Sequence, residues 1–309
     1  MSGLQRWAAV ALAALGLSVA TQAAQAQDDG PRVYQLAPEG LQTLTVFLVN
    51  KRGDEGPDPG QTTPGSETRT DILVLRYART YSWAGRQVTP FAILPVGRLE
   101  VKQGAGAGGR SSGLGDVQLG GTVGLFGAPA LDRTTYAAYR PALSMSLLGR
   151  VYFPTGDYSR QQPVNLGANR FSYQLGLPTT FMFGQSYRDA RLTALEVLPT
   201  VTFYSPNHAP FGTADQRTQA PMFSVEAHLT HNLPHRVWLS ADLLYRDGGE
   251  SRTDGVDNDD LVHGWSAGAS AALPCVGSTS LILTYQHVVK RWDSGPDGWF
   301  FRTALVAPF

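Results

Sequence analysis

The sequence is poor in cysteine and in charge, and beyond its first residues it contains no long apolar run. Its only cysteine, Cys275, cannot form an internal disulfide, so the chain is not a disulfide-stapled secreted domain. Charged residues make up 16% of the chain, against about 25% in a typical soluble domain. The formal net charge of +0 disfavours the basic surface that nucleic-acid binding needs.

The N-terminus has the pattern of a secretory signal peptide over residues 1–26. Arg6 supplies the positive charge, residues 7–20 form a short apolar stretch, and Ala24-Gln25-Ala26 offers a small-x-small cleavage pattern. The apolar stretch is shorter than the ~20 residues that a spanning helix needs, which disfavours an N-terminal anchor. We therefore predict Sec-type export and a mature chain that starts at Gln27.

About twelve segments of the mature chain alternate between apolar and polar residues. Such alternation is typical of strands, because successive side chains of a strand face opposite sides. No apolar run of ~18 residues follows the signal peptide, so a helical span is excluded. In lipid, the remaining structure that satisfies every backbone polar group is a closed barrel. The predicted strands are 41–50, 70–79, 86–102, 114–126, 138–153, 169–183, 191–204, 220–231, 236–247, 261–273, 279–290 and 298–309.

The connections between these segments differ in length. Long polar stretches such as 51–69 alternate with short ones such as 80–85, although 127–137 is longer than a turn requires. Short periplasmic turns and longer outer loops are typical of bacterial outer-membrane barrels. We predict an all-β fold, an antiparallel transmembrane β-barrel over 41–309, in the outer membrane of a Gram-negative bacterium. Residues 27–40 are expected to form a periplasmic segment or a partial plug of the lumen.

The last predicted strand ends the chain on an aromatic residue. Trp299, Phe301, Leu305 and Phe309 lie on one face of this strand. A final strand that ends in this way resembles the signal that the barrel-assembly machinery recognises, so Phe309 is the predicted assembly signal. The other expected partners are outer-membrane lipid and lipopolysaccharide.

Two glycine-containing motifs lie at the ends of predicted strands. The stretch Gly113-Leu114-Gly115-Asp116 opens one strand, and Pro154-Thr155-Gly156-Asp157 follows another. With Leu166-Gly167-Ala168-Asn169 they resemble an outer-membrane family labelled as a meta-pathway phenol-degradation component, over roughly residues 40–309. The resemblance implies a barrel that moves hydrophobic or aromatic compounds. The residues themselves suit turns, with a substrate or ion contact as the alternative.

The inward-facing register places charges of both signs inside the predicted barrel. They either pair in a structural network that fills the lumen or set the selectivity of a narrow polar path. A barrel of about twelve strands lies between small filled barrels and open porins, so both alternatives stay open. The candidate lumen residues are Arg76, Arg150, Glu196, Glu226, Asp242, Arg246 and Arg302.

One predicted outer loop is rich in acidic residues. Asp254, Asp257 and Asp259 offer the oxygen ligands that Ca²⁺ prefers, but without the spacing of an EF-hand, so they form either a weak divalent site or a solvated loop. Among the histidines, His228 should point inward and His231 outward, which argues against a metal site in their strand.

No nucleophile–base constellation, phosphate loop, dinucleotide fingerprint or zinc motif is present in the sequence. We therefore predict no enzymatic activity, no cofactor and no nucleic-acid partner. The predicted function is a channel or transporter-like barrel for passive passage of small compounds, with hydrophobic or aromatic ones implied by the resemblance. The alternatives are a lipid-modifying enzyme of the outer membrane and a structural or adhesive barrel with a closed lumen.

Overall fold

The computed structural model describes residues 28–54, 66–103, 108–140, 142–187, 189–292, 295 and 297–309; the predicted signal peptide lies outside them. Strands dominate the described residues. The elements are β1 (Gln42–Gly53), β2 (Ser66–Arg79), β3 (Tyr81–Trp83), β4 (Arg86–Gln103), β5 (Gly109–Leu114), β6 (Gln118–Phe126), α2 (Arg133–Ala138), β7 (Leu143–Tyr152), β8 (Ser172–Gly176), β9 (Thr179–Phe183), β10 (Thr193–Tyr204), β11 (Arg217–Gln219), β12 (Met222–Asn232), the 3₁₀ turn η1 (Pro234–Arg236), β13 (Trp238–Gly248), β14 (Ser251–Thr253), β15 (Val256–Asp257), β16 (Val262–Pro274), β17 (Ser280–Arg291) and β18 (Gly298–Pro308).

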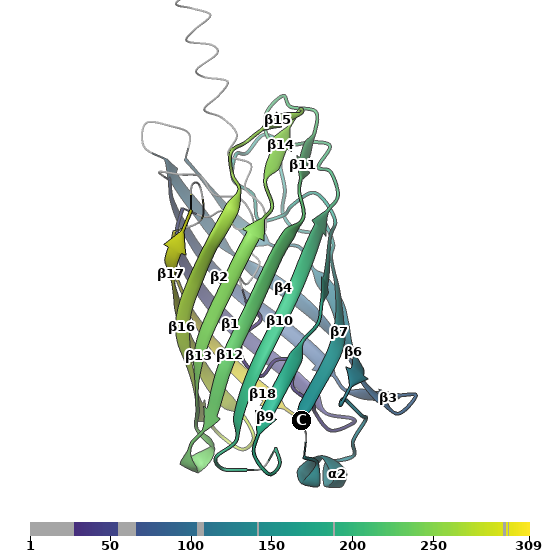
Figure 1. Cartoon of the computed structure of the whole chain (residues 1–309). Coiled ribbons are helices and arrows are strands. Elements are labelled where there is room, and N and C mark those ends of the chain that lie inside the picture. The colour runs from purple at the N-terminus through teal and green to yellow at the C-terminus, as the bar shows by residue number, and fades with distance from the viewer. Residues whose placement is uncertain are drawn as a thin grey trace, which may run out of the picture.

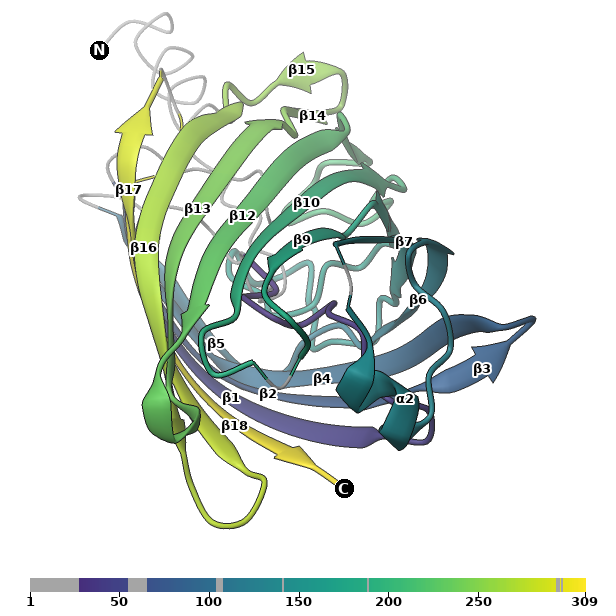
Figure 2. The same cartoon turned by 60° about the horizontal axis from the view of Figure 1, so that its bottom comes forward.

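Within the described residues, twelve antiparallel strands close into a barrel (Figures 1 and 2). The pairs β5 with β6 and β8 with β9 each make up one interrupted barrel strand, and the short β3 extends the hairpin between β2 and β4. The last strand pairs back onto the first, from Thr43 opposite Pro308 to Gly53 opposite Gly298. Closure leaves no unpaired sheet edge, as lipid requires. The predicted fold class is confirmed.

The two interruptions correct the predicted strands 114–126 and 169–183, each of which was expected to be continuous. The second breaks at Leu177 and Pro178 because proline has no N–H to donate to the ladder. The carbonyl of Pro178 still accepts a hydrogen bond from the Ser146 N–H at 3.0 Å, so the barrel wall stays joined there.

The long connection after β6 contains the helix α2. The side chain of Asp132 caps this helix by accepting hydrogen bonds from the N–H groups of Thr134 and Thr135, both at 2.8 Å. Hydrogen bonds from Thr135 and Thr134 lower the pKa of Asp132. The predicted strand 138–153 therefore starts too early, because β7 begins at Leu143. No helix among the described residues has the length and apolar character to cross a membrane.

Side chains alternate between the two faces of the barrel wall. On β12, Leu229 is 50% exposed and its neighbour Thr230 is 0% exposed. The outer face carries large apolar side chains, among them Leu48, Leu175 and Tyr285, which form the band that faces lipid. The inner face is where the polar and charged side chains gather.

The two ends of the barrel differ in structure. The turn end carries α2, β3 and both chain-terminal strand ends, where the Gln42 N–H donates to the Phe309 carbonyl at 3.0 Å (Figure 1). The loop end carries a small separate sheet of β11, β14 and β15. Residues 28–40, which we call the N-terminal segment, begin inside the barrel and lead to β1 at the turn end (Figure 2).

Candidate functional site

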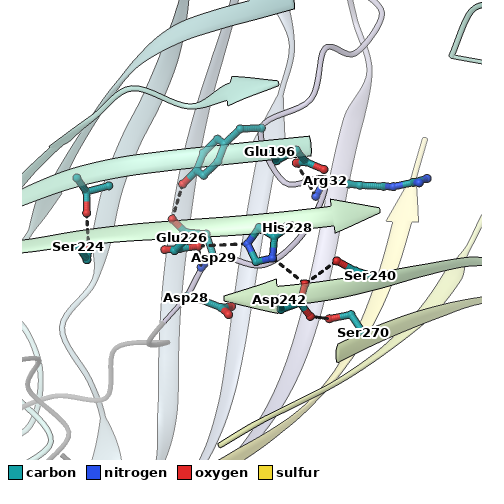
Figure 3. Close-up of polar contacts among 12 residues, drawn as sticks. Asp28, Asp29, Arg32, Glu196, Ser224, Glu226, His228, Ser240, Asp242 and Ser270 are labelled. Carbon is teal, nitrogen blue, oxygen red and sulfur yellow. Dashed lines mark hydrogen bonds and ion pairs between the residues drawn. The ribbon is translucent and has the colours of Figure 1, made fainter. Parts of the chain in front are cut away.

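The N-terminal segment is held inside the barrel by side chains of the wall. The Asp29 N–H donates to Glu226 Oε2 at 3.0 Å, and the Arg32 N–H donates to Glu196 Oε2 at 2.9 Å (Figure 3). Because this segment is not part of a sheet, its backbone donors need such partners when they are buried. The carboxylates of the barrel wall thus accept the backbone hydrogen bonds that a neighbouring strand would accept in a sheet.

Three carboxylates on neighbouring strands form what we call the acidic wall: Glu196 on β10, Glu226 on β12 and Asp242 on β13. The strand register places His228 directly opposite both Glu196 and Asp242. Its Nδ1 lies 2.8 Å from Asp242 Oδ1, and its Nε2 lies 3.6 Å from Glu226 Oε2 (Figure 3). The histidine therefore separates two buried carboxylates that would otherwise repel each other.

Asp242 also accepts hydrogen bonds from hydroxyl groups of the barrel strands. The hydroxyls of Ser240 and Ser270 each donate to it at 2.5 Å. Ser270 in turn lies 2.9 Å from the hydroxyl of Thr284 on β17. A carboxylate with three donors around it is well satisfied without any group from the N-terminal segment.

Three buried arginines lie on strands other than those of the acidic wall, and we call them the arginine wall: Arg76 on β2, Arg150 on β7 and Arg302 on β18. Two of them bind acidic residues of the N-terminal segment. Arg302 Nη1 lies 2.9 Å from Asp28 Oδ1, and Arg150 Nη2 lies 2.7 Å from Asp29 Oδ2. The segment thus brings to the arginine wall the carboxylates that this wall does not contain.

The contact at Arg150 includes a tyrosine from the same segment. The Tyr34 hydroxyl donates to Asp29 at 2.7 Å and accepts from Arg150 Nη2 at 2.7 Å. Arg32 points the other way: its guanidinium donates to Thr230 at 3.2 Å and lies 4.6 Å from the ring centroid of Trp238. The segment therefore presents acids to the arginine wall and a base to the acidic wall.

All seven lumen candidates from the sequence are buried on the inner face of the barrel, and the structure brings six of them into these two walls. Arg246 is buried as well, near the loop end of β13, and has contacts of its own. Sequence reasoning missed Asp28, Asp29 and Arg32, which carry no periodic signal. In the sequence, these three residues are marked only by their charge within a short polar stretch.

A cavity of about 460 Å³ lies between the N-terminal segment and the inner faces of β1, β2 and β18, toward the turn end. A second cavity of about 30 Å³ adjoins it. Both cavities are lined by Asp29, Val33, Phe47, Arg76 and Arg302, so these five residues stand between them.

Beneath this cavity, the turn end is covered by the connection that contains α2. Leu36 of the N-terminal segment packs against Ala128 and Leu131 of that connection, with Tyr136 beside them. The Glu39 N–H donates to the Leu131 carbonyl at 2.7 Å. The unusual length of this connection is explained by its packing against the N-terminal segment.

At the loop end, part of the connection after β7 folds inward. Val164 and Leu166 are buried and pack in one cluster with Leu99 and Val101 of β4 and Ile72 of β2. The alternating pattern of the strands did not predict this apolar contact with the inner face.

The two family motifs meet at the break between β5 and β6. Asp116 accepts hydrogen bonds from the N–H groups of Gly156 and Ala168, both at 2.8 Å. Asp157 accepts from the Leu114 N–H at 2.8 Å, and Thr155 Oγ1 accepts from the Val117 N–H at 3.0 Å. The motif side chains thus satisfy the backbone of the interrupted strand.

The motif glycines allow this close approach. A Cβ on Gly113, which has φ +143°, would lie 1.8 Å from Asp157 Oδ2. A Cβ on Gly156 would lie 2.7 Å from the backbone carbon of Gly115. Gly115 itself lies against Pro95, and Pro154 begins the turn that carries Thr155, so the contacts of these residues are structural.

The acidic loop does not gather its carboxylates. Asp254 accepts from the Gln216 N–H at 2.9 Å, Asp257 binds Arg252 at 2.5 Å, and Asp259 is exposed. No group of three or more His, Cys, Asp or Glu side chains suited to a metal ion occurs within the described ranges. The acidic loop is instead hydrogen-bonded, through Asp254, to the loop that carries β11.

An ion pair buried beneath the acidic loop reinforces this fastening. Arg217 Nη2 lies 3.1 Å from Asp260 Oδ2, and the Ser251 hydroxyl donates to the same carboxylate at 2.6 Å. Burial raises the pKa of Asp260, against the opposing effect of Arg217. The loop end therefore has its own ordered polar core.

A closed antiparallel barrel with an apolar outer face and a polar, partly occupied lumen defines an outer-membrane β-barrel protein. The chain is similar to the COG4313 outer membrane channel from Pseudomonas putida F1, with 21% identity, coverage of 91% of this chain and 100% of that chain, and a TM-score of 0.75. It is also similar to the beta domain of the Bordetella autotransporter BrkA, with 12% identity, coverage of 88% and 100%, and a TM-score of 0.51. At these identities the likeness is one of fold.

The sequence, unlike the fold alone, assigns the chain to a family. It belongs to the family described as "Putative MetA-pathway of phenol degradation", whose model matches residues 52–299. No curated protein matches it. The family resemblance seen in the two glycine-containing motifs is thereby confirmed.

Proposed function

We propose that the protein is a passive channel of the outer membrane for small hydrophobic or aromatic compounds, and that the N-terminal segment is a partial plug in its lumen. The observation that carries this proposal is the cavity of about 460 Å³ beside the segment. Its size lies within the ~300–1,000 Å³ of typical ligand pockets. The aromatic class of permeant is supported by the description of the family.

The polar groups of the lumen favour passage over catalysis. His228 and the acidic wall are engaged with one another, with serines of the wall and with the N-terminal segment. A catalytic base would need to face a nucleophile or a substrate position instead. We therefore assign these groups the role of fixing the segment and the local barrel geometry.

We further propose that the signal peptide directs Sec-type export and that the barrel-assembly machinery inserts the chain beside lipopolysaccharide. Phe309 is exposed and pairs with Gln42 through its backbone, so its ring is free to be recognised. Deletion of Phe309 should lower the amount of protein in outer-membrane fractions, whereas Phe309→Tyr should not. Equal amounts in both variants would remove Phe309 from the assembly signal.

Conductance tests the channel. The purified barrel in a planar bilayer should give a small unitary conductance, because the segment narrows the lumen. Catechol, a neutral aromatic, should reduce the ion current by occupying the cavity, while glucose should not. A barrel without measurable conductance would instead favour the closed structural alternative, and release of fatty acid from the bilayer lipid would favour the enzyme.

A further inference from the structure

Among the described residues, one guanidinium of the arginine wall has no carboxylate of its own. Arg76, on the inner face of β2, is 9% exposed and lines both cavities. Arg150 contacts both carboxylate oxygens of Asp29, and Arg302 contacts Asp28. Asp29 also acts on Arg76 through its charge, but among the described residues Arg76 makes no hydrogen bond or ion pair.

The charges around the cavity leave an excess of positive charge. Its charged lining residues are Arg32, Arg76, Arg302 and Asp29. Arg302 is paired with Asp28, and Asp29 is paired with Arg150, so the excess lies on Arg32 and Arg76. A buried guanidinium that makes no hydrogen bond is costly, because its lost hydration is not replaced. The position of Arg76 is therefore one at which a bound anion would be stabilised.

The rest of the cavity surface is mostly apolar and partly aromatic, with threonine hydroxyls such as those of Thr45 and Thr122 among its polar groups. The Arg76 guanidinium carbon lies 4.9 Å from the ring centroid of Phe91, and Arg150 lies 5.3 Å from the same ring. Phe47 lines both cavities, with Ala78 and Ile282 also on the wall of the larger one. Such a surface accepts a hydrocarbon or aromatic body next to a single charge.

We propose that this cavity binds a small amphipathic monoanion, with its acid group on Arg76 and its apolar body against Phe47 and Phe91. The planar fork of N–H groups on a guanidinium matches a carboxylate, and a charge-assisted hydrogen bond is about twice as strong as a neutral one. A neutral aromatic would fill the same space but leave Arg76 unpaired, so the site should discriminate by charge. The inference deepens the proposed channel function and rests on it for the view that the ligand is a permeant.

Binding can be measured by titration calorimetry on the full mature barrel in detergent, with benzoate as the probe and benzamide as its neutral isostere. Wild-type protein should bind benzoate at least about tenfold more tightly than benzamide. Arg76→Gln should lose this preference, while Arg76→Lys should retain part of it because the charge remains. Arg79→Gln is the matched control, because Arg79 lies on the same strand, is exposed and stacks on Tyr81 instead.

The outcomes separate the site from the channel. Equal binding of benzoate and benzamide by the wild-type protein would overturn the anion site, and this comparison needs no variant to fold. Unchanged benzoate binding by Arg76→Gln, with heat-modifiable gel migration as proof of folding, would overturn the role of Arg76. Charge-selective binding by a barrel that conducts nothing would leave the site intact and contradict the proposed channel.

Discussion

The acidic wall and the arginine wall face the same lumen, but they are stabilised in different ways. Asp242 finds its partners on its own strand and on the strands beside it, through His228, Ser240 and Ser270. Arg150 and Arg302 find their carboxylates on the N-terminal segment. Asp242 is thus satisfied once the barrel has closed, whereas the two arginines find their carboxylates only when the segment is in place. Glu196 and Glu226 also accept hydrogen bonds from the segment, but from its neutral backbone N–H groups.

This difference indicates what holds the segment. Its two aspartates neutralise buried charges that have no carboxylate from the strands, whereas on the acidic side Glu196 and Glu226 accept hydrogen bonds from neutral donors of the segment. The Arg32 guanidinium adds a contact there with Thr230 and the ring of Trp238. We therefore expect the arginine wall to determine whether the segment stays in the lumen.

The largest effect is expected from Asp28→Asn combined with Asp29→Asn. Each change removes the carboxylate from a buried pair, and breaking such a pair costs about 3–5 kcal/mol. Release of the segment relieves this cost, so the unitary conductance should rise several-fold and the segment should become accessible to protease. Glu39→Gln, on an exposed side chain of the same segment, is the control and should change neither. A double variant with wild-type conductance would contradict the dependence of the arginine wall on the segment.

The next effect tests the assumption that both walls face away from lipid. Leu229→Arg, on the outer face of β12, should destabilise the barrel by about 2–4 kcal/mol if it lies near the midplane. His231→Arg lies on the same face near the turn end, where the cost should fall to about 0–1 kcal/mol. Thr230→Arg is a poor control, because Thr230 already accepts a hydrogen bond from Arg32. If refolding titrations showed that His231→Arg destabilises the barrel more than Leu229→Arg does, this assignment of depth would be contradicted.

A smaller effect is expected within the acidic wall. Asp242→Asn keeps the volume but removes the charge beside His228, and hydrogen bonds to charged groups contribute about 1.5–3 kcal/mol. The barrel should lose stability in a urea titration while its conductance stays unchanged, because Asp242 does not contact the segment. Asp71→Asn, on a carboxylate that accepts a surface hydrogen bond from Asn50, should shift stability by less than about 0.5 kcal/mol. A rise in conductance in Asp242→Asn would mean that Asp242 also helps to hold the segment.

The barrel and the faces of its strands could be predicted because both depend on a local pattern with a period of two. Arg76, Glu226 and Asp242 are all buried on the inner face, and Leu229 is exposed on the outer one. The breaks in two strands were missed because the alternation continues on either side of them. Near Pro178 the missing N–H was visible in the sequence, but its effect on the ladder depends on the register with the neighbouring strands.

The assembly of the lumen could not be predicted in the same way. Arg32 and Glu196 are 164 residues apart in sequence, and the segment that carries Arg32 has no periodic pattern. The inward orientation of His228 was readable, but its position opposite Asp242 follows only from the pairing of β12 with β13. The excess charge at Arg76 likewise appears only when every partner of the three arginines is known.

The smallest effect separates charge from hydrogen bonding at the arginine wall. Tyr34→Phe keeps the ring but removes the hydroxyl that links Asp29 to Arg150. A hydrogen bond to a charged group contributes about 1.5–3 kcal/mol, but the two charged partners of this hydroxyl stay bound to each other in the ion pair between Arg150 and Asp29 at 2.7 Å. Stability should therefore fall by less than in Asp242→Asn, and conductance should stay near the wild-type value. If Tyr34→Phe opened the channel as far as the double aspartate variant does, the hydroxyl rather than the ion pair would be what holds the segment against this wall.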